Sequence, residues 1–337
     1  MLEKNLKSLT EEDIRPAKLM IDQQKCVEVD RQFLLSNRNK WVEVSCPACM
    51  SSESNFYGEK EGFTYVECKK CGTVYTNPRP SLNLMHEFYA NSQNYAYWNK
   101  YIFPATEDNR RERIFCPRAK KLVEYCRKFG VKTNTLLEVG AAFGTFCEEI
   151  RKENLFQNII ALEMTPDLAS TCRGRGFEVL EMSIEGVQKD QIADVIASFE
   201  VIEHLFSPHE FIMQCSRLLK PNGLLVLSCP NVRGFDVATL KTLSSTFDHE
   251  HVNYFHPQSL SLLVEQCGFK VLEVQTPGQL DADLVRKQAV NGLISLDNQP
   301  FLQEILINRW DEIGDSFQKF LADHKLSSHM WIVAQKI

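Results

Sequence analysis

The pattern of hydrophobic and polar positions changes near residue 134. Beyond it, short apolar runs alternate with segments of helical periodicity, which is typical of an α/β domain. Because helices alternate with strands, we expect a mostly parallel sheet with helices on both faces. The pattern predicts strands at 135–139, 158–163, 177–180, 193–199, 224–228, 269–274 and 330–334, with helices at 143–152, 211–219 and 258–267.

Four segments surround or interrupt this pattern. Residues 1–40 are charged and weakly patterned, and we treat them as an N-terminal extension. Residues 41–80 hold two short alternating stretches that each lead into a pair of cysteines, so we expect a small module there. Residues 81–133 are predicted to be a helical linker or lid. Within the domain at 134–337, residues 278–325 are predicted to be a helical insert before the last strand.

The two cysteine pairs are Cys46 with Cys49 and Cys68 with Cys71, in the spacing C-x2-C-x18-C-x2-C. A two-residue gap lets both sulfurs of a pair face one ion, and this spacing is typical of structural zinc. Four sulfurs fill a tetrahedral shell and leave no place for a catalytic water, so we expect a structural Zn²⁺ in a small ribbon. A disulfide scaffold and a redox dithiol are the alternatives, and the composition of the chain disfavours both.

The composition of the chain limits which partners and which cellular compartment we expect. The chain has 337 residues, a formal net charge of -6 and no long basic run, so a nucleic-acid partner is not expected. It has no apolar segment of signal-peptide or membrane-span length at its N-terminus or elsewhere, so no membrane partner is expected. Eight of the 12 cysteines lie outside the two pairs without regular spacing. Scattered free cysteines suit a reducing compartment, and we expect a cytoplasmic enzyme.

An acidic residue and three small residues follow the register acid-x-Gly-x-small-x-Gly at the end of the strand 135–139. They are Glu138, Gly140, Ala142 and Gly144. Small residues let the backbone turn sharply and approach a ligand. This register resembles motif I of class I S-adenosylmethionine-dependent methyltransferases, with Glu138 for the commoner Asp and Ala142 for the middle Gly. The resemblance implies a Rossmann-like α/β fold and S-adenosyl-L-methionine as the cofactor.

The same resemblance assigns further cofactor-binding residues. Glu163 ends the next strand, where a carboxylate accepts hydrogen bonds from ribose hydroxyls, and Met164 beside it is expected to pack on adenine. Ser183 stands where the family contacts the adenine edge. Glu200 ends the fourth strand at the carboxyl edge, where open α/β sheets bind ligands. Tyr95 is our candidate for an aromatic lid, although aromatic residues at helical spacing also form ordinary core.

The string Asp248-His249-Glu250-His251, followed by Tyr254, is the first candidate for the chemistry. With the N-terminal cysteine module, it resembles the zinc-containing sugar C-methyltransferases, which carry Tyr-His-Glu-His. Here Asp248 replaces the tyrosine. The resemblance implies that His251 is the base, that Glu250 orients it and that Tyr254 belongs to the site. The acceptor would be a small polar molecule such as a nucleotide-linked sugar or another cell-surface or natural-product intermediate, methylated on carbon or oxygen. An inert polar loop is the alternative.

The second candidate is the run Glu200-Val-Ile-Glu203-His204. It resembles the Glu-x-x-Glu-His of ubiquinone-pathway O-methyltransferases, in which the three side chains hold a divalent ion. Two carboxylates and an imidazole would lower the pKa of an acceptor hydroxyl through such an ion. His204 would then act in metal-assisted O-methylation of a hydroxylated small molecule. A third hypothesis is a non-catalytic binding protein that keeps the methyltransferase fold.

Overall fold

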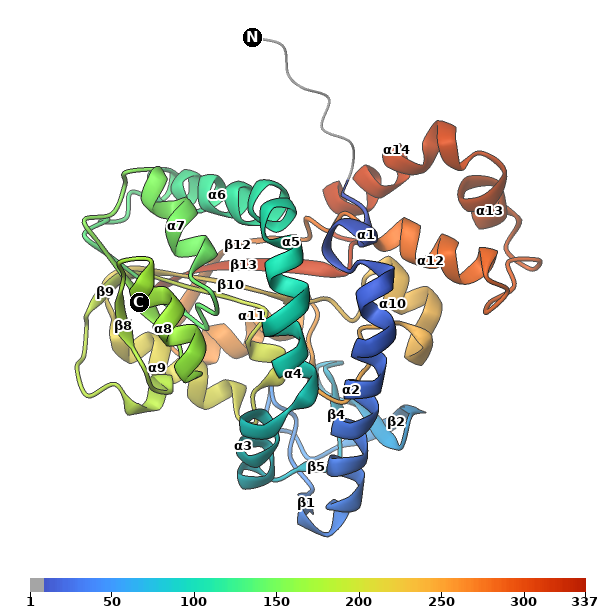
Figure 1. Ribbon diagram of the computed structural model, residues 1–337, viewed down its shortest axis with the longest axis horizontal. Coiled ribbons are helices and arrows are strands. Elements are labelled where there is room, and N and C mark those ends of the chain that lie inside the picture. Colours follow the sequence, from blue (N-terminus) through green and yellow to red (C-terminus); the bar gives the residue numbers. More distant parts are fainter. Residues whose placement is uncertain (1–8) are drawn as a thin grey trace.

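A seven-stranded sheet forms the centre of the larger part of the molecule (Figure 1). The computed structural model describes residues 9–337. The strand order across the sheet is β12-β13-β10-β9-β6-β7-β8. The strands are β6 (Thr135–Val139), β7 (Asn158–Leu162), β8 (Glu178–Leu180), β9 (Ala193–Phe199), β10 (Leu219–Pro230), β12 (Phe269–Gln275) and β13 (His329–Lys336).

The prediction that most strands of the sheet pair in parallel is confirmed. Strands β10, β9, β6, β7 and β8 pair in parallel, and β13 lies antiparallel between β10 and β12. All seven predicted strands are present, and β10 begins five residues before the predicted 224 because Leu219 already pairs with Ala193 of β9. The result is a Rossmann-like mixed sheet, which places the ends of β6, β7 and β9 at one edge.

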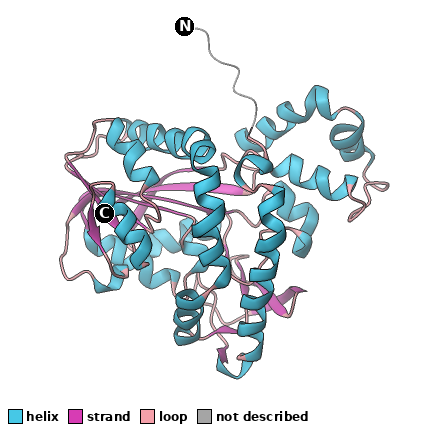
Figure 2. Cartoon of the chain, in the orientation of Figure 1, coloured by secondary structure: helices cyan, strands magenta, loops and turns pink. Residues whose placement is uncertain are grey.

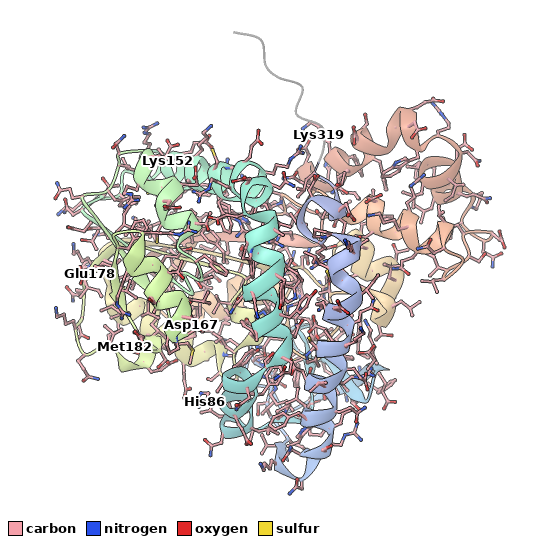
Figure 3. The ribbon with its side chains drawn as sticks, in the orientation of Figure 1. His86, Lys152, Asp167, Glu178, Met182 and Lys319 are labelled. Carbon is pink, nitrogen blue, oxygen red and sulfur yellow. The ribbon has the colours of Figure 1, made fainter. Side chains whose placement is uncertain are left out.

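Helices cover both faces of the sheet (Figure 2). Leu122 and Phe146 belong to the core on one face, and Phe211 and Leu260 belong to the core on the other. Charged side chains such as Lys152 project outward from these helices (Figure 3). The covering helices are α6 (Cys116–Lys128), α7 (Thr145–Lys152), α8 (Pro166–Gly174), α9 (Pro208–Leu218) and α11 (Pro257–Gln266).

The N-terminal helices lie against the body of the molecule. Helix α2 runs beside α4 and α5 in Figure 1, and α2 and α4 are in contact. The expected linker at 81–133 is not a separate unit, because α6 buries Leu122 in the core of the main sheet. The expected extension at 1–40 forms two helices, at 11–14 and 17–36, and its first eight residues lie outside the described part. These helices are α1 (Glu11–Ile14), α2 (Ala17–Ser36), α3 (Leu82–Asn91), α4 (Gln93–Tyr97) and α5 (Phe103–Arg110).

The cysteine module is built on a four-stranded sheet that includes a strand from the large domain. Its order is β11-β4-β3-β2, and the pairing of β11 with β4 adds a strand from outside residues 41–80 to this sheet. The buried Arg79 strengthens this junction, because its guanidinium donates to Asn253 Oδ1 (3.0 Å) and to the Val252 carbonyl (3.1 Å). The strands are β1 (Trp41–Val42), β2 (Ser54–Lys60), β3 (Phe63–Cys68), β4 (Val74–Thr76), β5 (Arg79–Pro80) and β11 (Asn253–Tyr254).

The predicted insert is helical and has its own small core. Leu240 of α10 packs there with Val285 and Leu321 of the insert. In Figure 1 the insert projects from the side of the sheet. Among the described residues, no helix combines the length and the apolar character that crossing a bilayer requires. The helices are α10 (Phe235–Leu240), α12 (Asp281–Val290), α13 (Pro300–Gln303) and α14 (Trp310–Asp323).

Candidate active site

The small residues after β6 form a tight turn into α7. Gly140 has φ +79°, and a Cβ on it would lie 2.6 Å from Val201 Cγ2, so only glycine fits there. Gly144 is left-handed (φ +69°) and precedes the first residue of α7. Ala142 also has a positive φ, of 48°. The backbone therefore turns without side chains in its way, and α7 directs the positive end of its dipole at this edge of the sheet.

Glu163 is tied to this turn. One carboxylate oxygen accepts from the Ala142 amide at 2.8 Å, and the other accepts from the Thr165 amide at 2.9 Å. The side chain is buried, and burial raises its pKa. Each carboxylate oxygen has a second lone pair. The carboxylate is thus held in one orientation and can accept two more hydrogen bonds, as a ribose diol requires.

Glu138 lies deeper in the same site. Its carboxyl is buried and accepts from Cys147 Sγ at 2.9 Å. Burial raises the pKa of Glu138 to about 8, outweighing the hydrogen bond from Cys147 and the charge of Arg118. This acid therefore holds its proton in the folded protein over a range in which an exposed glutamate would have lost it.

The raised pKa of Glu138 predicts a falling stability with rising pH. Between its ordinary value of 4.5 and about 8, the unfolded chain has released a proton that the folded carboxyl keeps. Its contribution to the free energy of unfolding thus falls by about 1.4 kcal/mol per pH unit in this window. We expect Glu138→Gln to flatten the slope and to be roughly 2–4 kcal/mol more stable than the unaltered protein near pH 8.

Urea unfolding at several pH values measures this effect. Glu178→Gln, at an exposed position labelled in Figure 3, is the matched control and should keep the slope. Identical slopes in Glu138→Gln and in the unaltered protein would contradict the prediction.

Glu200 at the end of β9 has three polar neighbours. Its Oε1 accepts from Ser228 Oγ at 2.5 Å and lies 3.7 Å from Arg118 and 3.5 Å from His329 Nδ1. Burial by itself would raise the pKa of Glu200, but His329 and Arg118 outweigh it and lower the pKa. The arrangement keeps Glu200 ionised beside a largely buried guanidinium. The carboxylate of Glu200 and the guanidinium of Arg118 together are suited to binding a zwitterionic ligand.

The other predicted cofactor residues lie at different depths. Met164 is 59% exposed next to Glu163, so its side chain is free to cover a ligand. Ser183 is exposed, and its carbonyl accepts from the Gly186 amide. Tyr95 packs edge-on against Tyr89, with ring centroids 5.5 Å apart. Burial, and then the charges of Glu250 and Glu163, raise the pKa of Tyr95, which places its hydroxyl among the acids of the site.

His251 is oriented by Thr246 and Asp248. Its Nδ1 lies 2.8 Å from the Thr246 carbonyl oxygen and 3.3 Å from Asp248 Oδ2. A carbonyl only accepts, so Nδ1 carries the hydrogen and Nε2 has the basic lone pair. Asp248 also accepts from the His251 amide at 2.7 Å. Burial opposes its ionisation, but His251 and His249 outweigh that effect and lower the pKa of Asp248.

The predicted pairing of Glu250 with His251 is therefore wrong. The carboxylate of Glu250 accepts from Asn94 Nδ2 at 2.5 Å and lies 3.7 Å from His249 Nε2. Successive residues of the loop point in different directions, which sequence adjacency does not reveal. Tyr254 is buried, and its hydroxyl donates to the His251 carbonyl at 2.7 Å, so it holds the backbone of His251.

His204 and Glu203 lie next to His251. The rings of His204 and His251 meet edge-on with centroids 4.6 Å apart, and Tyr89 contacts His204 Nδ1 at 3.3 Å. Burial, and then the charge of His251, lower the pKa of His204 to about 3, so its imidazole is neutral. Neither carboxylate oxygen of the buried Glu203 has a hydrogen-bond partner within residues 9–337. Burial and the nearby Glu200 raise its pKa.

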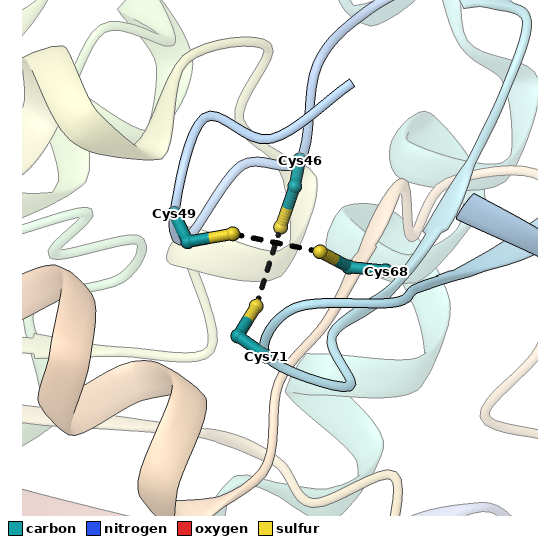
Figure 4. A group of neighbouring side chains, drawn as sticks. All are labelled: Cys46, Cys49, Cys68 and Cys71. Atoms are coloured by element: carbon teal, nitrogen blue, oxygen red, sulfur yellow. Dashed lines mark hydrogen bonds between the residues drawn. The ribbon is translucent and has the colours of Figure 1, made fainter. Parts of the chain in front are cut away.

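The four predicted cysteines converge on one point (Figure 4). Cys46 Sγ lies 3.5 Å from Cys71 Sγ, and Cys49 Sγ lies 3.5 Å from Cys68 Sγ. A disulfide needs about 2.05 Å, so these sulfurs are not bonded to each other. An ion with Zn–S bonds of about 2.3 Å in a tetrahedral shell separates its sulfurs by about 3.8 Å. The cluster fits a tetrahedral thiolate shell within a few tenths of an ångström.

Comparison with known proteins identifies the class of the domain. Residues 108–274 match the family model for a methyltransferase domain. C-methyltransferase NovU from Streptomyces niveus is 28% identical over 166 residues, which cover 47% of this chain and 38% of that protein. A ubiquinone biosynthesis O-methyltransferase from Coxiella burnetii is 25% identical over 182 residues, which cover 48% and 76%. A solved S-adenosylmethionine-dependent methyltransferase from Archaeoglobus fulgidus covers 70% of this chain and 100% of its own, with 19% identity and a TM-score of 0.46.

The chain thus carries an S-adenosylmethionine-dependent methyltransferase domain at residues 108–274, which confirms the predicted class of enzyme. The match to NovU reaches little more than a third of the length of that protein. The cysteine cluster lies outside residues 108–274, which the family model matches.

Sequence reasoning did not find three residues of this site. Arg118 and His329 flank Glu200 from α6 and β13, far from it in sequence. Asn94 contacts Glu250 from α4. The contacts arise from tertiary packing, and only the position of Arg118 on the helix before the cofactor turn was a usable signal.

Proposed function

We propose that this protein transfers a methyl group from S-adenosylmethionine to a small polar acceptor, with His251 as the base. The acceptor we favour is a nucleotide-linked sugar or a related cell-surface or natural-product intermediate. The observation that carries the proposal is the orientation of His251, whose Nδ1 is committed to the Thr246 carbonyl. A fixed tautomer with a free Nε2 is what proton removal from an acceptor requires.

The residues of the cofactor turn fit S-adenosylmethionine, which supplies an activated methyl group when it is bound. Glu163 would accept from the ribose hydroxyls, because both of its oxygens are held by backbone amides and retain a lone pair. Glu200 and Arg118 offer opposite charges to the amino-acid part. Met164 and Tyr95 would cover the ligand. Gly140 leaves the backbone open to close approach.

His251 and Asp248 would handle the proton. Nε2 of His251 takes a proton from the carbon or oxygen that is methylated, and the imidazole becomes an imidazolium. Asp248 Oδ2, 3.3 Å from Nδ1, stabilises the new positive charge. His204 is a poorer base because its pKa lies near 3. Glu250 would then help to position the loop through its hydrogen bond with Asn94 and would take no part in proton transfer.

We also propose that the four cysteines hold a structural Zn²⁺. The fit of the four sulfurs to a tetrahedral thiolate shell supports this. The module carries β4, whose partner strand β11 follows His251 by two residues. Zinc would therefore act on catalysis through the position of this loop. The similarity to NovU, a C-methyltransferase, supports carbon as the acceptor atom.

One observation favours a second function, metal-assisted O-methylation. Glu203, His204 and His251 offer ligand atoms within 4.8 Å of one another, and the oxygens of Glu203 have no hydrogen-bond partner in the described part of the chain. In such a site His251 would take the place of Glu200, the ligand predicted from the sequence, because Glu200 accepts a hydrogen bond from Ser228. A turnover that depends on added Mg²⁺ or Mn²⁺, with the cysteine-bound metal intact, would favour this function over base-assisted transfer.

Cofactor binding provides the first test. We expect Glu163→Gln to bind S-adenosylhomocysteine about 10- to 100-fold more weakly, because hydrogen bonds to a charged carboxylate contribute about 1.5–3 kcal/mol. Isothermal titration calorimetry measures the change, with Glu178→Gln as the surface control. Equal affinities of Glu163→Gln and the unaltered protein would remove the proposed cofactor site.

A further inference from the structure

A second polar cluster lies beside His251 and takes no direct part in the proposed proton transfer. It consists of Asp30 on α2 together with His249 and Glu250 in the loop before β11. Each side chain offers one ligand atom, and these atoms all lie within 4.8 Å of one another. The cluster joins the N-terminal extension to the loop that carries His251, although more than 200 residues separate them in sequence.

His249 is the least satisfied group of this cluster. It is 4% exposed, and neither ring nitrogen has a hydrogen-bond partner among residues 9–337. Glu250 Oε1 lies 3.7 Å from Nε2, which is too long for a hydrogen bond. Phe88 packs edge-on against the ring, with centroids 5.8 Å apart. A buried imidazole without a partner is unfavourable, so a ligand that supplies a partner is stabilised at this position.

The two carboxylates are held in place and retain free lone pairs. Asp30 Oδ1 accepts from the Gln93 amide at 2.8 Å, and Oδ2 accepts from Ser92 Oγ and the Asn94 amide. These bonds occupy three of about four lone-pair positions. Glu250 is fixed by Asn94 Nδ2 on one oxygen. Both acids therefore keep an oxygen lone pair for a further positive partner.

We propose that Asp30, His249 and Glu250 bind a divalent transition-metal ion. One imidazole and two carboxylates are a common ligand set for Zn²⁺ and Mn²⁺. Bonds of about 2.0–2.2 Å require the ligand atoms to approach by about 1–2 Å, which side-chain rotation supplies. His249 is almost fully buried, so a single ion fits this position better than an acceptor molecule does.

The ion would link α2 and α4 to the loop that carries His251. Asp30 already holds the start of α4 through the Gln93 and Asn94 amides, and Glu250 precedes His251 directly. The N-terminal extension would thus gain a role in fixing the position of the base. The metal site itself does not depend on the acceptor or on methyl transfer.

Titration with Mn²⁺ tests the proposal. Mn²⁺ prefers oxygen and nitrogen ligands and binds more weakly than Zn²⁺, so it should leave the cysteine-bound Zn²⁺ in place. We expect the full chain, with its zinc content measured, to take up Mn²⁺ as detected by loss of the free-ion electron paramagnetic resonance signal. His249→Gln and Glu250→Gln should each lose one equivalent. His86→Gln, at an exposed position labelled in Figure 3, should keep it.

Two variants keep the test decisive. Glu250→Gln keeps an oxygen that can accept from Asn94 Nδ2, so it covers the case in which His249→Gln does not fold. Far-ultraviolet circular dichroism checks the fold of both variants. His204→Gln distinguishes this cluster from the one at Glu203. If the unaltered protein takes up no Mn²⁺ at millimolar concentration, the proposal is wrong. It is also wrong if the equivalent disappears in His204→Gln but remains in His249→Gln and Glu250→Gln.

Discussion

His251→Gln should reduce methyl transfer by roughly 100- to 10,000-fold, the range that a positioned general base contributes. Glutamine keeps most of the volume of the ring but has no basic nitrogen at the position of Nε2. The His251 side chain contacts Thr246, Asp248 and His204. None of these residues belongs to the cofactor turn, so binding of S-adenosylhomocysteine should stay within a few fold. Transfer of a labelled methyl group to a panel of nucleotide-linked sugars measures turnover, and calorimetry measures binding.

His86→Gln is the matched control, because it makes the same chemical change on the exposed side of α3. It should leave both turnover and binding unchanged. His204→Gln is informative as well, since a neutral imidazole with a pKa near 3 contributes little as a base. Turnover that is lost in His204→Gln but kept in His251→Gln would reverse our assignment of the base.

Cys46→Ser should release the bound metal and unfold the cysteine module. Structural zinc contributes about 10–16 kcal/mol to the folding of small zinc-finger peptides, and a shell of three thiolates retains only part of it. Cys46 is fully buried, so its replacement also leaves a hydroxyl without a metal partner. We expect the zinc content of the purified protein to fall by about one equivalent. Limited proteolysis should then cut within 41–80 while the sheet from 135 to 336 persists.

The effect of Cys46→Ser should reach turnover. The Thr76 amide donates to the Val252 carbonyl at 3.1 Å, and Arg79 bonds the same carbonyl, so an ordered module holds the residue that follows His251. Cys26→Ser, outside the cluster, controls for the loss of a thiol. If Cys46→Ser keeps its metal content and its resistance to proteases, the four cysteines do not hold a structural metal.

The sheet was predictable because each of its strands is a short local pattern. The runs 135–139 and 193–199 are mostly apolar and match β6 and β9 at both ends. Buried parallel strands are apolar on both faces, so they differ sharply from the turns that flank them. Errors occurred at element ends, where a single contact decides. Helix α9 begins at Pro208 rather than 211, after Ser207, which accepts from the Glu210 amide.

The cofactor turn and the four cysteines were also visible in the sequence, because their chemistry depends on residues a few positions apart. A two-residue gap brings two sulfurs to one ion, and a glycine at Gly140 marks a backbone that must turn closely. The pairing of Cys46 with Cys71 and of Cys49 with Cys68 across the cluster required the structure.

By itself, the sequence determined the order of strands and helices along the chain, the position of the cofactor turn and the presence of two cysteine pairs, because local spacing and periodicity define them. Only the tertiary structure decided that Asp248 rather than Glu250 contacts His251, and that Asp30 meets His249. Side-chain direction in an irregular loop depends on the backbone angles of each residue. Those angles are set by packing against helices and strands from other parts of the chain, and no short sequence window contains that information.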